Sequence, residues 1–60
     1  MYERTIKRIR ETLMLTQQEF AKLVGVSRQT VAFWETGVRG ISLKNSRKIV
    51  EICHKNYIEI

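Results

Sequence analysis

Sixty residues with 43% hydrophobic content predict one small folded domain, close to the lower size limit for folding without disulfides or a metal. The single cysteine excludes an intrachain disulfide, and no apolar run approaches the roughly 20 residues of a membrane span. Eleven basic against six acidic residues give a formal net charge of +5, which favours a polyanionic partner, with nucleic acid first. The first residues lack the charged-then-apolar pattern of a secretion signal, so we expect a cytoplasmic protein.

The first expected element is a helix over residues 1–13. Tyr2, Ile6, Ile9 and Leu13 are spaced by four, three and four residues, which puts them on one helical face. The chain has no proline and little of the alternation that a sheet needs. We therefore expect the whole fold to be all-α.

Residues 16–37 predict two short helices joined by a tight turn. Thr16 is an N-cap, and Glu19 follows at the capping-box spacing. Gly25 ends the first helix, because glycine enters the left-handed conformation without a Cβ penalty. The apolar stripe of this helix consists of Phe20, Ala21, Leu23 and Val24.

Ser27 is the N-cap of the second helix, which we expect to run to about Thr36 and to end at Gly37. Two capped helices this close together cross steeply, as in a helix-turn-helix. At about 100° per residue, Val31 and Trp34 point inward, with Ser27 and Thr30 towards the same side. The opposite face consists of Arg28, Gln29, Ala32, Phe33 and Thr36.

The side chains of this opposite face suit base edges in a DNA major groove. Arginine pairs with guanine, glutamine with adenine, and a small or aromatic side chain contacts a thymine methyl. A solvent-facing Phe33 is otherwise hard to explain in a small domain. We therefore expect base contacts from Arg28, Gln29, Ala32 and Phe33.

A loop with Arg39 leads to a last helix, which Ser42 caps and which we expect to continue to Cys53. Arg39 and Lys44 are candidate phosphate contacts, with a merely solubilising charge as the alternative for each. The apolar side chains of residues 55–60 either form a short fifth helix that closes the core or face a second subunit.

The motif residues together resemble the helix-turn-helix domain of the lambdoid phage repressor and Cro family, also called XRE-like. The matching residues are Arg10, Gln17, Ala21, Gly25, Val31, Trp34, Glu35, Gly37, Ser42, Leu43 and Ile49. The resemblance covers nearly the whole chain. It implies one compact, all-α, four- to five-helix lambda-repressor-like domain over residues 1–60, with the motif at about 16–37.

The resemblance also implies roles for particular residues. Arg10 is expected to form a structural ion pair with Glu35, although two independent surface charges are the alternative from the sequence alone. Gln17 matches a phosphate-contacting glutamine of the family. The phosphate contacts expected in all are Gln17, Ser27, Thr30, Arg39 and Lys44. Many relatives have a proline where this chain has Ile41, so the path of the preceding loop stays open.

No constellation for catalysis is present in the sequence. His54 follows Cys53 directly, but neighbours on a helix point about 100° apart, so they do not form a dyad. Two ligands are too few for a zinc site, and the chain has no aspartate for paired-carboxylate chemistry. We expect no enzyme activity, no cofactor, no metal and no small-molecule ligand.

The expected function is sequence-specific binding of double-stranded DNA by a transcriptional regulator. It would be a phage or bacterial repressor or Cro-like protein that binds a palindromic operator as a homodimer, in the cytoplasm and associated with the nucleoid. An antitoxin-type or other protein-interaction module of the same fold is the alternative. A second alternative is a DNA-binding fragment of a larger repressor.

Overall fold

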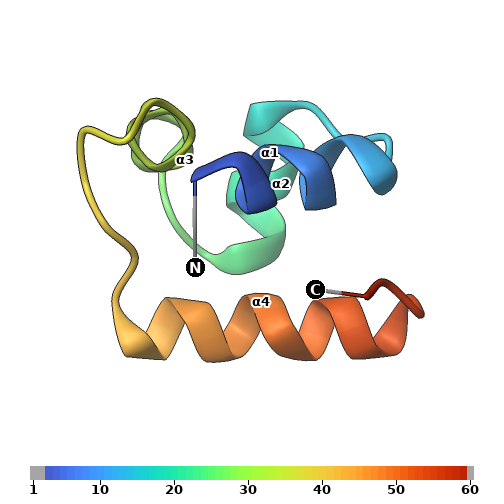
Figure 1. The fold of residues 1–60 in the computed structure, drawn as a ribbon. Helices are drawn as coiled ribbons and strands as arrows, with labels where there is room; N and C mark the ends of the chain where they lie inside the picture. Colours follow the sequence, from blue (N-terminus) through green and yellow to red (C-terminus); the bar gives the residue numbers. More distant parts are fainter. Residues whose placement is uncertain (1–2, 60) are drawn as a thin grey trace.

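The structure is a computed structural model that describes residues 3–59, and within them it contains four α-helices and no strand. The helices are α1 (Glu3–Thr12), α2 (Gln17–Val24), α3 (Arg28–Thr36) and α4 (Leu43–Lys55). Figure 1 shows α4 running beneath the other helices, with a long loop joining it to α3. The predicted all-α fold and the predicted helix-turn-helix, formed by α2 and α3, are confirmed.

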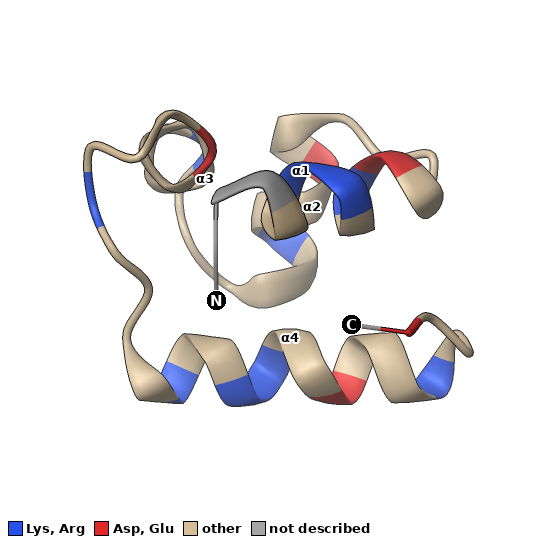
Figure 2. Ribbon diagram, viewed as in Figure 1, with Lys and Arg blue, Asp and Glu red and all other residues tan. Residues whose placement is uncertain are grey.

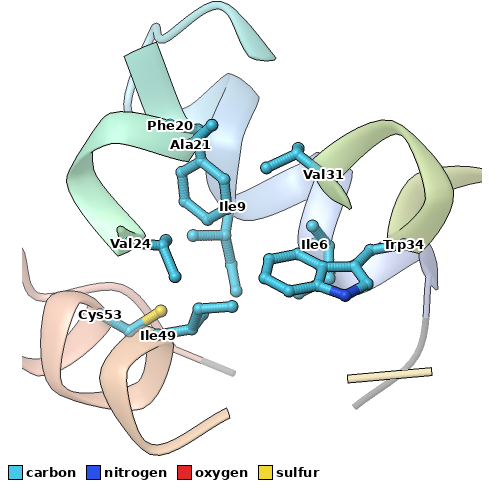
Figure 3. Close-up of a cluster of buried hydrophobic side chains, with 9 residues drawn as sticks. All are labelled: Ile6, Ile9, Phe20, Ala21, Val24, Val31, Trp34, Ile49 and Cys53. Carbon is cyan, nitrogen blue, oxygen red and sulfur yellow. The ribbon is translucent and has the colours of Figure 1, made fainter. Parts of the chain in front are cut away.

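The core draws side chains from all four helices. Figure 3 shows them converging on one cluster, in which each large apolar side chain contributes roughly 1.5–3 kcal/mol of transfer free energy. Trp34 and Val31 fix the inner face of α3, as expected from the sequence. The cluster consists of Ile6, Ile9, Phe20, Ala21, Val24, Val31, Trp34, Ile49 and Cys53.

The N-caps of three helices follow the sequence closely. Thr16 and Glu19 form the complete capping box of α2, since each side chain bonds the other residue's backbone N–H. Ser27 caps α3 by accepting from the Thr30 N–H at 3.1 Å, and Ser42 caps α4. These bonds satisfy backbone donors that have no partner within the helix, so they fix where α2, α3 and α4 begin.

All four helices end with a residue in the left-handed conformation. Met14 follows α1 at φ 59°, Gly25 follows α2 at 89°, Gly37 follows α3 at 78° and Tyr57 lies after α4 at 56°. In each case the next residue donates its backbone N–H to the carbonyl five positions earlier, as in a Schellman motif. The donors are Leu15, Val26, Val38 and Ile58, at distances of 3.1, 2.9, 3.0 and 2.9 Å.

The ends of the chain differ from the sequence-based expectation. The described part of α1 is Glu3–Thr12, so the helix ends one residue before the expected Leu13, while residues 1 and 2, with Tyr2 of the expected stripe, lie outside the described residues. Within residues 56–59 no fifth helix forms, because Tyr57 turns the chain away from the helical path. Ile58 then packs against the core, while Tyr57 is 96% exposed.

Leu23 is not part of the buried stripe of α2, contrary to expectation. Its side chain is 51% exposed. At 100° per residue, Val24 lies within about 40° of Phe20, whereas Leu23 lies about 60° away on the other side. The stripe that faces the core therefore consists of Phe20, Ala21 and Val24.

Candidate nucleic-acid interface

The outer face of α3 carries exposed and half-buried side chains, whereas the inner face of the same helix is packed into the core. Arg28 and Gln29 are exposed on its first turn, and Ala32 is half-buried one turn later. Thr36 is exposed near the end, where its hydroxyl donates to the Ala32 carbonyl at 3.0 Å. This face carries two long hydrogen-bonding side chains at its N-terminal end, with little bulk between them and the solvent.

Phe33 differs from the expected solvent-facing residue. Its side chain is half-buried, and the Arg39 guanidinium carbon lies 5.1 Å from the centre of its ring. This distance is within the range of cation–π attraction. The pairing is absent from the sequence-based expectation, which had assigned Phe33 and Arg39 to separate contacts.

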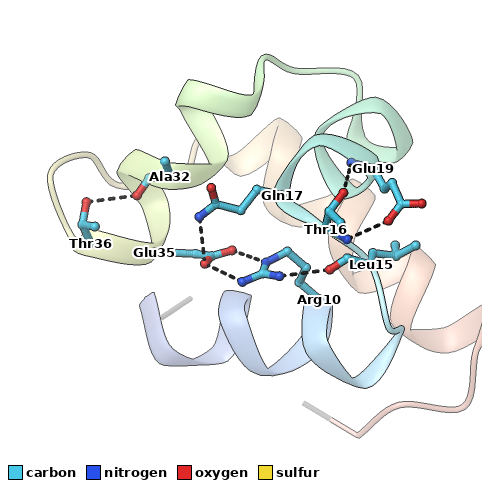
Figure 4. A network of polar contacts seen from close by, with 8 residues as sticks. All are labelled: Arg10, Leu15, Thr16, Gln17, Glu19, Ala32, Glu35 and Thr36. Atoms are coloured by element: carbon cyan, nitrogen blue, oxygen red, sulfur yellow. Dashed lines mark hydrogen bonds and ion pairs between the residues drawn. The ribbon is translucent and has the colours of Figure 1, made fainter.

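An ion pair connects α1 to α3. The Arg10 Nε atom lies 2.6 Å from Glu35 Oε2, and Arg10 Nη2 donates to Glu35 Oε1 at 3.0 Å, so the contact is bidentate. Arg10 Nη1 also donates to the Leu15 carbonyl at 3.0 Å. The two charged side chains are only 14% and 6% exposed, and Figure 4 shows them between the helices. The expected pair is thus in direct contact. Arg10 also holds the loop after α1 through its bond to the Leu15 carbonyl.

Gln17 joins this network. Its Nε2 atom donates to Glu35 Oε1 at 3.3 Å, and Figure 4 shows the side chain directed from the start of α2 towards α3. Burial acts to raise the pKa of Glu35, but the hydrogen bonds from Arg10 and Gln17 and the charge of Arg10 outweigh it, so the pKa lies below its usual range. Glu35 is therefore ionised at neutral pH.

The remaining phosphate candidates lie at the starts of helices or in the α3–α4 loop. Ser27 is exposed and Thr30 is half-buried, and their hydroxyl oxygens lie 2.8 Å apart. One hydrogen suffices for that bond, so the pair retains a second hydroxyl hydrogen for another acceptor. Arg39 and Lys44 are exposed, and Figure 2 shows basic residues also along α1 and α4.

The family of the chain follows from a comparison with protein-family models. The helix-turn-helix model HTH_3 matches residues 6–60, which include all of α2, α3 and α4. The chain belongs to the HTH_3 helix-turn-helix family. This family comprises DNA-binding regulators and is typically non-enzymatic.

Two curated relatives of this HTH_3 domain match most or all of the chain. Antitoxin PezA of Streptococcus pneumoniae is 35% identical over 60 residues, which is 100% of this chain and 38% of the antitoxin. An uncharacterized HTH-type transcriptional regulator of Archaeoglobus fulgidus is 45% identical over 47 residues, 78% of this chain and 66% of the regulator. The chain thus spans less than two thirds of the length of either relative. No solved structure gave a significant match.

The cysteine and the histidine of this HTH_3 domain both lie on α4. Cys53 is fully buried, and burial raises the pKa of its thiol, which keeps it protonated. His54 is exposed on the same helix. Residues 3–59 contain no group of three side chains that would hold a metal ion, and none of their helices is long and apolar enough to cross a membrane.

Besides the bond from Gln17 to Glu35, two further contacts of the HTH_3 domain were not predicted from the sequence. The Lys48 Nζ atom donates to the Val24 carbonyl at 3.3 Å, which brings a positive charge to the C-terminus of α2. Arg39 over Phe33 is the other. Neither has a local spacing signal, because each joins a helix to a later segment through a turn or a tertiary contact.

Proposed function

We propose that this chain is a sequence-specific, double-stranded DNA-binding transcriptional regulator that places α3 in the major groove. Residues 1–60 would act as a single domain in the bacterial or phage-infected cell, associated with the nucleoid. The observation that carries the proposal is the outer face of α3. Arg28 and Gln29 are exposed there, while Val31 and Trp34 anchor the opposite face in the core.

The proposed base contacts follow from the chemistry of that face. Arg28 would bond O6 and N7 of a guanine, and Gln29 would bond N6 and N7 of an adenine. Ala32 and Phe33 complete the set of side chains assigned to base edges. Arg28 would be the main determinant of specificity, since a bidentate arginine–guanine contact is the commonest specific one.

The proposed phosphate contacts surround this face. The first backbone N–H groups of α2 have no partner within the helix, so the Gln17 end favours an anion. The Gln17 side chain has two amide hydrogens, and its contact with Glu35 needs only one. The full proposed set is Gln17, Ser27, Thr30, Arg39 and Lys44. These contacts would fix the position of α3 without distinguishing sequences.

Regulation would act by occupancy. One recognition helix contacts few base pairs, so we propose a homodimer on a palindromic operator, with half-sites about one helical turn apart. RNA polymerase would then be excluded from an overlapping promoter, as expected of a repressor.

Selection from random duplexes tests this function. The purified protein is incubated with a random library at about physiological salt, and the bound duplexes are sequenced. We expect an inverted repeat with half-sites about 10 base pairs apart. Failure to enrich any sequence, with only weak and salt-sensitive binding, would contradict the proposal.

A second candidate is an antitoxin-type module that binds another protein. It is favoured by the 35% identity to Antitoxin PezA across the whole chain. The salt dependence of binding separates the two candidates, because a protein that neutralises several phosphates loses affinity steeply as salt rises. A chain that binds no duplex at 50 mM salt would favour the protein-binding candidate.

A further inference from the structure

The turn after α3 brings Arg39 back over its own helix. The Phe33 carbonyl accepts the N–H of Gly37, that of Val38 at 3.0 Å and that of Arg39 at 3.4 Å. Gly37 makes this wrapping possible through its left-handed conformation. Phe33 therefore contacts Arg39 in two ways. Its carbonyl accepts the backbone N–H of Arg39, and its ring lies under the guanidinium, whose carbon is 5.1 Å from the ring centre.

The charge of Arg39 is not neutralised within the described side chains. The ion pairs among them join Arg10 to Glu35 and Lys55 to Glu51, and no described carboxylate lies within ion-pair distance of Arg39. A ring attracts the cation without using up conventional hydrogen bonds, so the N–H donors of the guanidinium remain available to an anion. The Arg39 guanidinium thus lies over the Phe33 ring without a counter-charge among the described side chains.

The same geometry limits what the Phe33 ring does itself. The ring is half-buried, and the guanidinium lies over it. A thymine methyl would have to reach a ring that Arg39 partly covers. The contact with Arg39 therefore competes with direct recognition of a base by Phe33.

We propose that Phe33 is a positioning residue: its ring holds Arg39 beside the end of α3, where the guanidinium binds a DNA phosphate at the edge of the groove. This inference rests on the proposed DNA-binding function and replaces the thymine-methyl role of Phe33. Holding a long side chain before binding reduces the conformational entropy lost when DNA binds. An arginine gains from this because its fork of donors is already planar.

The test measures affinity for the selected operator against salt concentration. Arg39→Ala is expected to lower the affinity about 5- to 10-fold near 0.1 M salt and to reduce the slope of log K against log salt by about 1. Phe33→Leu keeps apolar bulk but no ring, so Arg39 must be ordered on binding and the affinity should fall by most of the same factor. Phe33→Tyr keeps the ring and should restore the wild-type affinity.

The controls separate positioning from other effects. Lys55→Ala removes one positive charge in an exposed pair at the end of α4 and should leave the slope unchanged. The double variant Phe33→Leu, Arg39→Ala should bind no more weakly than Arg39→Ala alone, because the two residues act as one unit. In the free protein, NMR should show upfield-shifted side-chain protons of Arg39 that return to ordinary shifts in Phe33→Leu.

Several results would overturn the inference. An unchanged affinity in Phe33→Leu, or additive losses in the double variant, would mean that the ring does not position Arg39. A second operator has deoxyuridine, which lacks the methyl group, in place of one thymine. If Phe33 contacts that methyl, Phe33→Leu and the wild type should bind this operator with equal affinity, which would contradict the inference. If the wild-type chain binds no duplex, the proposed function itself fails and this role fails with it. Wild-type binding with unaltered variants overturns only the role of Phe33.

Discussion

The bidentate contact between Arg10 and Glu35 is largely buried, so the stability of the fold should depend on Arg10. Removing one partner of a buried pair strands the other charge, so Arg10→Met is expected to cost ~3–5 kcal/mol of unfolding free energy. Arg8→Met is the matched control, because that arginine is exposed and its hydrogen bond goes to the backbone carbonyl of Glu59. Urea denaturation of both variants measures the difference. Equal midpoints would show that Arg10 acts as a surface charge.

The depressed pKa of Glu35 gives the pair a pH signature. A carboxylate with a lower pKa in the folded state stabilises the fold fully above its unfolded pKa of about 4.3 and loses this contribution as pH falls through the folded pKa. Wild-type stability should therefore decline from about pH 5 downward. Glu35→Gln removes the titrating group, so its stability, measured by urea denaturation at each pH, should decline less. An identical decline in both proteins would exclude this coupling.

Met14 stores strain at the end of α1. Met14 is not a glycine, yet its φ is 59°. Its side chain is 89% exposed, so packing does little to offset this strain. Met14→Gly should raise the unfolding free energy by about 0.5–1 kcal/mol, the relief of left-handed strain exceeding the entropy that glycine adds to the unfolded chain. Thermal unfolding measures the change. Met14→Ala keeps the Cβ atom and should change stability by less than ~0.5 kcal/mol.

At the scale of elements, each helix is followed by a left-handed residue and then an apolar residue, and three of these four apolar residues pack against the core. The apolar residues that follow the left-handed positions after α1, α2 and α4 pack against the core, which stabilises those turns. Val38, the corresponding residue after α3, is 66% exposed. The turn after α3 is therefore held chiefly by the Phe33 carbonyl and by the conformation of Gly37.

Two glycines near this turn should respond differently to substitution by alanine. Gly37→Ala forces a Cβ atom into the left-handed region and should cost about 1–2 kcal/mol, a drop in Tm of several degrees for a domain of this size. Gly40 does not have a positive φ, and apart from its own chain neighbours no described heavy atom lies within 4 Å of an added Cβ. Gly40→Ala should therefore be neutral or slightly stabilising. A similar loss in both variants would contradict this account.

Local signals explain which elements could be predicted from the sequence. Thr16, Ser27 and Ser42 cap helices through bonds to residues three positions away, so the starts of α2, α3 and α4 were visible in the sequence. The ends of α1 and α4 were not, because Met14 and Tyr57 have no intrinsic preference for the left-handed conformation. Tertiary packing imposes it on them.

Some features of the candidate interface could likewise be predicted from the sequence, and others could not. The two faces of α3 follow from helical periodicity, and the resemblance to a known family implied the partner of Arg10. The contact of Gln17 with Glu35 and the contact of Arg39 with Phe33 depend on how helices and loops meet in space. No spacing rule specifies such contacts, so they emerge only from the packed structure.

At the scale of the whole molecule, the net charge of +5 and the small number of proposed base contacts per chain would serve affinity and specificity separately. In the proposed function, long-range charge would attract the DNA backbone, while a dimer would supply enough base contacts for specificity. Attraction by charge does not depend on the DNA sequence. The symmetry of a dimer should therefore appear in the consensus of the selected duplexes, as two related half-sites.

Arg28 provides the test of that symmetry. In a homodimer both copies of Arg28 contact the same position of their half-sites, so Arg28→Ala should relax two symmetry-related base pairs together, at a cost of ~1–3 kcal/mol per contact. Repeating the duplex selection with this variant measures both positions at once. Relaxation at a single position would indicate that one chain binds alone. An equal loss on operator and random DNA would make Arg28 a phosphate contact, since phosphate contacts carry no sequence information.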